Sequence, residues 1–76
     1  MYGHRITLDP EVCLGKPVIK GTRLKIEFIL DLLASGSTHE EIIEGYAIEE
    51  EDILAVLEYA KMVMERERVF IMPATP

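Results

Sequence analysis

The sequence predicts a single, mainly α-helical domain in which a short N-terminal β-ribbon precedes a bundle of three helices. The length of 76 residues excludes a second domain, because independent domains cluster at about 100–150 residues. Hydrophobic residues make up 49% of the chain and charged residues 29%, which is typical of a folded globular protein. Two short strand-like segments lie within residues 5–25, whereas apolar residues at helical spacing follow within residues 26–64.

The ribbon is predicted over residues 5–25. Arg5-Ile6-Thr7-Leu8 alternates polar and apolar side chains, as a half-buried strand does, and Asp9-Pro10 then ends it. A second strand is predicted over residues 17–20, bounded by Gly15 and Gly21, with Cys13 in the connecting loop. We expect a positive φ at Gly21 and a helix-capping role for Thr22.

The first two helices follow from apolar spacing and a capping signal. Ile26, Ile29, Leu30 and Leu33 fall at i, i+3, i+4 and i+7, which lines one face of a helix that Gly36 ends. Thr38 and Glu41 have the spacing of a capping box, so a short second helix begins there. Its apolar residues are Ile42, Ile43 and Tyr46.

The third helix is the longest predicted element. The four acids from Glu49 to Asp52 suit the positive end of a helix dipole. The core stripe is predicted at Ile53, Val56, Leu57, Ala60, Val63 and Met64. Residues 65–76 are assigned to a tail, because the helical pattern weakens after residue 64. Three helices with a short middle one have the order of a helix-turn-helix, homeodomain-like module.

The sequence also predicts a cytoplasmic protein. Its single cysteine, Cys13, cannot form an internal disulfide, whereas small secreted folds normally carry several. No segment reaches the roughly 18–20 apolar residues that span a bilayer. Residues 1–7 lack the apolar region of a signal peptide. We therefore expect neither export nor membrane insertion.

Two runs of the sequence resemble the bacterial family catalogued as domain of unknown function 433. They are Ile6 to Cys13 and the Gly-Lys-Pro-Val-Ile-Lys-Gly-Thr-Arg run at residues 15–23. The likeness continues at Ala34-Ser35-Gly36, Glu40-Glu41-Ile42, Asp52-Ile53 and Leu57-Glu58-Tyr59-Ala60. It implies a helix-turn-helix-like fold, dimerisation, and a role similar to that of a type II antitoxin beside a PIN-like ribonuclease toxin. The chain departs from the family at Leu14, where a second glycine is common, and at Lys25, where a proline is common.

Charge divides the chain into two unlike parts. Residues 5–25 carry five basic and two acidic residues, a net charge of +3, whereas residues 26–76 carry three basic and twelve acidic residues, a net charge of −9. The candidate nucleic-acid contacts are the five cations of the first part, Arg5, Lys16, Lys20, Arg23 and Lys25. A solvated strand edge is the alternative interpretation. Arg23 is also a candidate for bonds to carboxylates of the acidic part.

The third helix is a poor candidate for reading DNA bases. The N-terminal residues of a recognition helix face bases and phosphates, and here they are the four acids from Glu49 to Asp52. These carboxylates would repel DNA, so any DNA contact must come from residues 5–25 or from a partner.

Extra apolar rows on two helices predict association with another chain. Phe28 and Leu32 lie off the main face of the first helix, and Ala55, Tyr59 and Met62 form a separate row on the third. A helix that is apolar on several sides is normally buried from several sides. We expect a homodimer; the alternative is that these rows complete the core of the monomer.

The tail supplies further candidate contacts with a toxin partner. Arg66, Arg68 and Phe70 combine cations with an apolar anchor, which suits a nuclease site that gathers carboxylates around a metal. The alternative is a terminus that is disordered or exchanged between copies of a dimer.

No enzyme, metal site or cofactor is predicted. Gly15-Lys16 is not part of a phosphate-binding P-loop, because prolines stand at positions 10 and 17 where that motif needs glycine and a hydroxyl residue. His4, Cys13 and His39 have no recurrent ligand spacing. Two functions are left. One is an antitoxin, a dimer that binds and inhibits a nuclease, with or without autoregulation through DNA binding. The other is a protein-interaction module without nucleic-acid binding.

Overall fold

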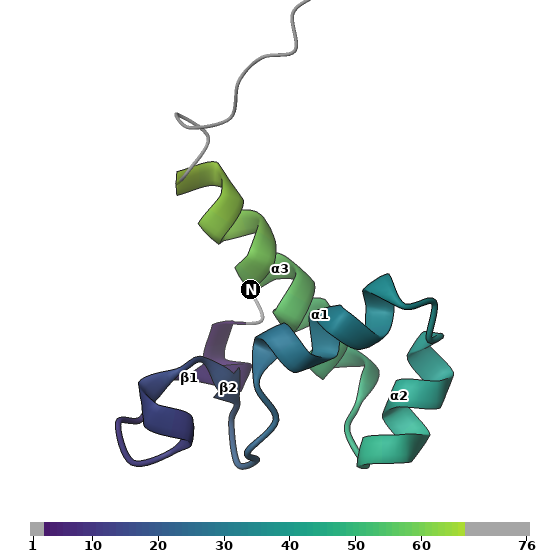
Figure 1. Ribbon diagram of the computed structural model, residues 1–76, viewed down its shortest axis with the longest axis horizontal. Coiled ribbons are helices and arrows are strands. Elements are labelled where there is room, and N and C mark those ends of the chain that lie inside the picture. Colours follow the sequence, from purple (N-terminus) through teal and green to yellow (C-terminus); the bar gives the residue numbers. More distant parts are fainter. Residues whose placement is uncertain (1–2, 67–76) are drawn as a thin grey trace, which may run out of the picture.

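The computed structural model describes residues 3–66 and confirms the predicted fold class (Figure 1). It contains helices α1 (Ile26–Ala34), α2 (His39–Tyr46) and α3 (Glu50–Arg66), strands β1 (Ile6–Thr7) and β2 (Val18–Ile19), and 3-10 turns η1 (Gly3–Arg5) and η2 (Cys13–Gly15). The two-stranded sheet precedes the helices and lies at one end of the molecule, opposite α2 (Figure 1). We call residues 5–25 the arm.

The strands of the arm are shorter than the sequence predicts. They pair antiparallel, with Ile6 opposite Ile19 and Thr7 opposite Val18. The strands predicted over residues 5–8 and 17–20 were each one residue too long at both ends. Arg5 belongs to the turn η1, and Leu8 lies beyond the ladder with 58% of its surface exposed. Beyond the paired residues, the Lys20 amide still donates to the Arg5 carbonyl at 2.7 Å, and the Pro17 carbonyl accepts from the Ile26 amide at 3.0 Å.

The turn between β2 and α1 is closed by Thr22. Its hydroxyl donates to the carbonyl of Ile19 at 2.7 Å and accepts from the amide of Leu24 at 3.0 Å. The predicted helix-capping role of Thr22 was therefore wrong, because its hydroxyl is engaged within the turn and the residue before α1 is Lys25. Gly21 has the predicted positive φ, +81°. Lys25 has φ −74°, a value that proline would also adopt.

The bundle is built as the helical spacing predicts. α1 buries Ile26 and Ile29. The capping box at the start of α2 is present, because the Thr38 hydroxyl accepts from the Glu41 amide at 3.1 Å and the Glu41 carboxylate accepts from the Thr38 amide at 2.9 Å. The main core cluster consists of Ile19, Ile26, Ile29, Ile42, Ile48, Ile53 and Val56.

The predicted core stripe of α3 holds only in the first half of that helix. Ile53 and Val56 are fully buried, but Leu57 is 40% exposed and Met64 is 60% exposed. Ala55, which the sequence assigned to a row for association, is instead buried. Leu57 and Met64 are exposed because α3 extends beyond the rest of the bundle, so its later turns are only partly covered (Figure 1). α3 continues to Arg66, beyond the predicted end at residue 64.

None of the helices within residues 3–66 is long and apolar enough to cross a bilayer. The predicted tail contacts Arg68 and Phe70 lie outside the described residues, and Arg66 is exposed at the end of α3.

Candidate functional site

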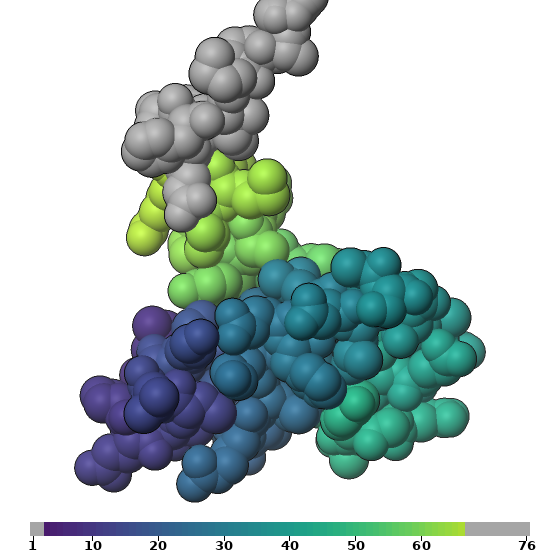
Figure 2. Space-filling view, in the orientation of Figure 1, coloured from purple at the N-terminus to yellow at the C-terminus, as the bar shows by residue number. Residues whose placement is uncertain are grey.

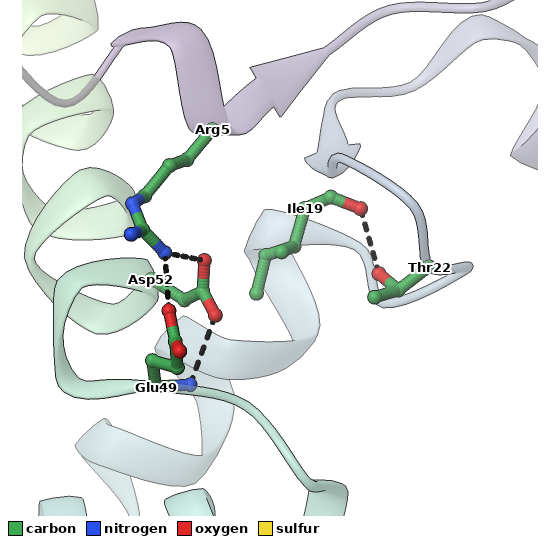
Figure 3. A network of polar contacts seen from close by, with 5 residues as sticks. All are labelled: Arg5, Ile19, Thr22, Glu49 and Asp52. Carbon is green, nitrogen blue, oxygen red and sulfur yellow. Dashed lines mark hydrogen bonds and ion pairs between the residues drawn. The ribbon is translucent and has the colours of Figure 1, made fainter.

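Arg5, predicted as a nucleic-acid contact, is held by two carboxylates of the molecule itself (Figure 3). Its Nη1 donates to Asp52 Oδ1 at 2.9 Å and to Glu49 Oε1 at 3.0 Å. These two hydrogen bonds, the one to Asp52 first, raise the pKa of the Arg5 guanidinium above its ordinary value. Arg5 therefore connects the arm to the start of α3, and its charge is largely neutralised there.

Asp52 serves two partners at once. While Oδ1 accepts from Arg5, Oδ2 accepts from the Glu49 amide at 2.9 Å and so satisfies an amide at the start of α3 (Figure 3). Asp52 is only 8% exposed, so both bonds are largely shielded from solvent. Sequence reasoning expected Arg23 to bond the acidic part of the chain, and the structure gives that role to Arg5.

Two further cations of the arm share one acid of α1. The Glu27 carboxylate lies 3.3 Å from Lys16 Nζ and 3.9 Å from Lys25 Nζ. All three side chains are well exposed, so each pair contributes about 0–1 kcal/mol. The pairs nevertheless reduce the positive field of the arm.

Lys20 and Arg23 are the arm cations without an ion pair among residues 3–66. Both are exposed on the turn that Thr22 closes. Lys20 lines a shallow hollow of about 240 Å³ with His4, Arg5 and Asp52. The five predicted nucleic-acid contacts thus separate into three cations with intramolecular partners and two that face solvent.

The apolar residues predicted for association on α1 pack inside the molecule. The rings of Phe28 and Tyr46 meet edge to face, with centroids 5.3 Å apart and planes at 86°. Phe28 and Leu32 both pack against the core cluster. Tyr59 also packs against this cluster, but it lines two grooves on the surface as well.

The outer half of α3, residues 57–66, stands away from the rest of the bundle (Figure 2). No residue in it is buried, and Leu57, Met62 and Met64 are between 37% and 60% exposed. These exposed apolar side chains make the outer half of α3 a candidate interaction surface.

A groove of about 910 Å³ runs between the arm and α3, and we call it the arm groove. Its apolar walls include Ile6 and Leu8 from the arm and Leu57, Tyr59 and Met62 from α3. Polar residues of α3 also line it, Glu58, Lys61 and Glu65. Lys61 Nζ lies 2.7 Å from Glu65 Oε2, and this hydrogen bond raises the pKa of Lys61 above its ordinary value.

A smaller groove of about 330 Å³, the α1–α3 groove, lies elsewhere along the same helix. Its apolar lining comes from Pro17, Ile26, Leu30, Ala60, Val63 and Met64. Lys16 and Glu27 also line it and form the ion pair described above. Sequence periodicity placed Val63 and Met64 in the core, and in the structure they line this open groove.

The histidine, cysteine and acidic side chains of the described residues are not gathered into a metal site. Residues 3–66 contain no cluster of three or more His, Cys, Asp or Glu side chains that could hold a metal ion. The Cys13 thiol donates to the Arg23 carbonyl at 3.4 Å, and His39 Nδ1 lies 2.9 Å from Glu50 Oε2.

Comparisons with known proteins agree with the sequence resemblance. A family model described as protein of unknown function (DUF433) matches residues 6–60, so the chain belongs to the DUF433 family. A crystal structure of a DUF433 member protein from Anabaena variabilis ATCC 29413 has a similar fold, with a TM-score of 0.75 and 24% sequence identity. The likeness covers 90% of this chain and 69% of that one. No significant match was found among curated proteins.

Proposed function

We propose that this DUF433 protein is the antitoxin of a type II toxin–antitoxin pair and that it binds and inhibits a PIN-like ribonuclease. The observation that carries the proposal is the arm groove beside the outer half of α3. This groove offers apolar walls at Leu57 and Met62 and carboxylates at Glu58 and Glu65. A small helical domain that exposes such a surface is suited to seat a segment of another protein.

Charge supports a nuclease as the partner. Residues 26–66 carry eleven acidic and two basic residues, a net charge of −9. A ribonuclease needs a basic surface to hold the RNA backbone. Opposite charge speeds encounter and favours the correct partner, so an acidic inhibitor can occupy the RNA path without performing any chemistry.

Repression of its own promoter is the second part of the proposal. In a dimer, Lys20 and Arg23 would supply four cations that face solvent, since the other three arm cations have carboxylate partners. With four phosphate contacts, the logarithm of the association constant should fall with the logarithm of the salt concentration with a slope of about −4. Fluorescence anisotropy with the promoter duplex at several salt concentrations measures this slope. The double variant Lys20→Ala, Arg23→Ala should abolish binding, whereas Lys16→Ala should retain most of it.

The pairing of Arg5, Lys16 and Lys25 with carboxylates favours a second candidate function. A protein with most of its arm cations neutralised is suited to be a protein-interaction module that never contacts nucleic acid. Absence of promoter binding at low salt, together with intact binding of a protein partner, would select this alternative.

Co-expression with the product of the adjacent open reading frame, if it encodes a PIN-like nuclease, tests the inhibitory function. We expect the wild-type protein to restore growth and to be captured with the nuclease. Met62→Glu places a charge in the arm groove and should abolish both, since Met62 is 37% exposed and the fold can accept the change. Ala34→Glu, an equivalent change at an exposed position at the end of α1, is the matched control. A folded Met62→Glu protein that still protects cells would overturn the role of the groove.

A further inference from the structure

The α1–α3 groove has only two charged residues in its lining, and they are paired with each other. Lys16 Nζ lies 3.3 Å from the carboxylate of Glu27, which also lies 3.9 Å from Lys25 Nζ. The rest of the lining is aliphatic or aromatic, with Val63 and Met64 on the side of α3. Burying a charged group against such a surface costs free energy. A suitable occupant is therefore uncharged and apolar.

The arm groove differs in this respect. Three charged side chains of α3 line it, those of Glu58, Lys61 and Glu65. Its walls thus combine apolar and charged surface, as the polar surface of another protein requires. An uncharged apolar segment fits the α1–α3 groove better than the arm groove.

Such a segment directly follows α3 in the sequence. Residues 69–72 are Val, Phe, Ile and Met, and Pro73 ends the run. They lie outside the described part of the chain. Val69 follows Arg66, the last residue of α3, by three positions. The segment therefore has the composition that the groove requires and is linked to one of the two helices that form it.

The link is long enough for the segment to reach the groove of its own chain. The groove borders α3 from Tyr59 to Met64, and at about 1.5 Å per residue these positions lie roughly 3–11 Å along the helix axis from Arg66. A chain spans at most about 3.3–3.6 Å per residue, so residues 69–72 can reach roughly 10–22 Å from Arg66. This reach covers every α3 position in the groove and leaves length for a turn.

We propose that residues 69–72 bind in the α1–α3 groove of their own chain, with Phe70 as the anchor. Phe70 has the largest apolar side chain of the four, and the groove volume of about 330 Å³ exceeds that of one such side chain. The covalent link favours this occupant over a separate molecule. A short linker gives an effective concentration on the order of 1 mM, about a thousandfold above that of a protein at 1 µM.

Binding of this segment is independent of nuclease inhibition, which we propose for the arm groove. It covers part of the apolar surface on the outer half of α3 from within the same molecule. It also withdraws Phe70 from the nuclease contact that the sequence predicts. The test needs neither nuclease nor DNA, so either proposal can fail without the other.

Tryptophan fluorescence of the full chain tests this binding. The chain has no tryptophan, so Phe70→Trp introduces a single fluorophore. We expect its emission at shorter wavelength than in urea, as for a buried indole. Met64→Glu places a charge in the groove and should move the emission to longer wavelength and raise the acrylamide quenching constant severalfold. Met62→Glu is the matched control in the arm groove and should change neither, since both methionines are exposed enough for the fold to accept glutamate.

Fluorine NMR gives the same test with side chains of native size. The chain contains two phenylalanines, Phe28 and Phe70, so incorporation of fluorophenylalanine gives two signals. Phe28 packs against the core cluster and serves as the internal reference. Met64→Glu should shift the Phe70 signal towards its position in urea and leave the Phe28 signal in place. Met62→Glu should shift neither signal. A Phe70 signal at its urea position in the wild-type chain would overturn the proposal, as would equal shifts in the two glutamate variants.

A mixing experiment distinguishes the groove of the same chain from that of a second copy. The double variant Phe70→Trp, Met64→Glu has the segment but a disrupted groove, whereas Phe70→Ala has an intact groove but no anchor. An excess of Phe70→Ala at about 10 µM, far below the effective concentration of a linked segment, should not restore the short-wavelength emission. Restored emission would show that the segment binds a second copy, and it would overturn binding within one chain.

Discussion

The two halves of α3 differ in what surrounds them. The inner half, residues 50–56, contains every buried residue of the helix, and its first turn is fixed by the bonds of Asp52 to Arg5 and to the Glu49 amide. The outer half, residues 57–66, has no buried residue and borders both apolar grooves. One half of this helix therefore builds the fold, and the other half carries the proposed binding surface. Substitutions in the two halves should have separable effects on stability and on association.

The largest expected difference concerns a core residue of the inner half. Ile53 is fully buried, so Ile53→Ala should cost about 2–5 kcal/mol. A domain of this size has only about 3–5 kcal/mol of stability from its core, and the variant should be largely unfolded. Met64→Ala in the outer half should cost less than about 0.5 kcal/mol in the monomer. Urea denaturation followed by circular dichroism measures both, and equal losses would remove the distinction between the halves.

Asp52→Ala should have the next largest effect, because it removes the acceptor for the Glu49 amide and leaves Arg5 with the exposed Glu49 alone. We expect a loss of about 1–3 kcal/mol in the free energy of unfolding. Glu51→Ala, a neighbouring acid that is exposed in the same helical turn, is the control and should change stability little. If the two variants have the same midpoint in urea, the link between the arm and α3 does not stabilise the fold.

The same substitution, alanine to glycine, can be made in each half of α3, so that the costs in stability can be compared directly. Ala60→Gly should cost at most about 1 kcal/mol, the difference in helix propensity. Ala55→Gly should cost roughly 1.5–2 kcal/mol, because it also removes a methyl group that is 1% exposed. Thermal denaturation of the two proteins in parallel gives the difference. A larger loss at position 60 would show that the outer half contributes more to the fold than its exposure indicates.

The smallest effect is expected for Lys61→Gln. The pair of Lys61 with Glu65 is well exposed, so its loss should not change the urea midpoint measurably at physiological salt. Glu65 raises the pKa of Lys61 above its ordinary value of 10.5. Because the pKa is raised in the folded state, the pair stabilises the fold fully below the ordinary pKa of lysine. This stabilisation is lost as the pH rises through the higher pKa of the folded state. The urea midpoints of wild type and variant should therefore coincide at every pH in the neutral range, and a difference that changes with pH in this range would contradict the expectation.

Local patterns account for the parts of the fold that the sequence predicts well. Apolar spacing in α1, the capping box at Thr38 and Glu41, and the positive φ of Gly21 all depend on residues close together in the chain. Each has a local physical signature that a single sequence displays.

The parts that sequence reasoning missed depend on distant residues or on the shape of the whole molecule. Arg5 and Asp52 are 47 residues apart, and no spacing rule connects them. The exposure of Leu57 and Met64 follows from where the rest of the bundle ends, which the periodicity of α3 cannot show. For Leu14 the sequence provided one indication, because the family often has glycine at this position. That indication did not show that the leucine would be both strained and exposed.

The distance along the chain between Arg5 and Asp52 has a consequence for synthesis of the protein. At about 5–20 residues per second, a ribosome needs roughly 2–9 s to add the 47 residues that separate them. During that interval the arm is finished, but its carboxylate anchor has not yet been made. The segment that is translated first is thus among the last to be fixed. A nascent chain stalled before residue 52 should present an arm that proteases cut readily, and a chain released after residue 66 should resist them.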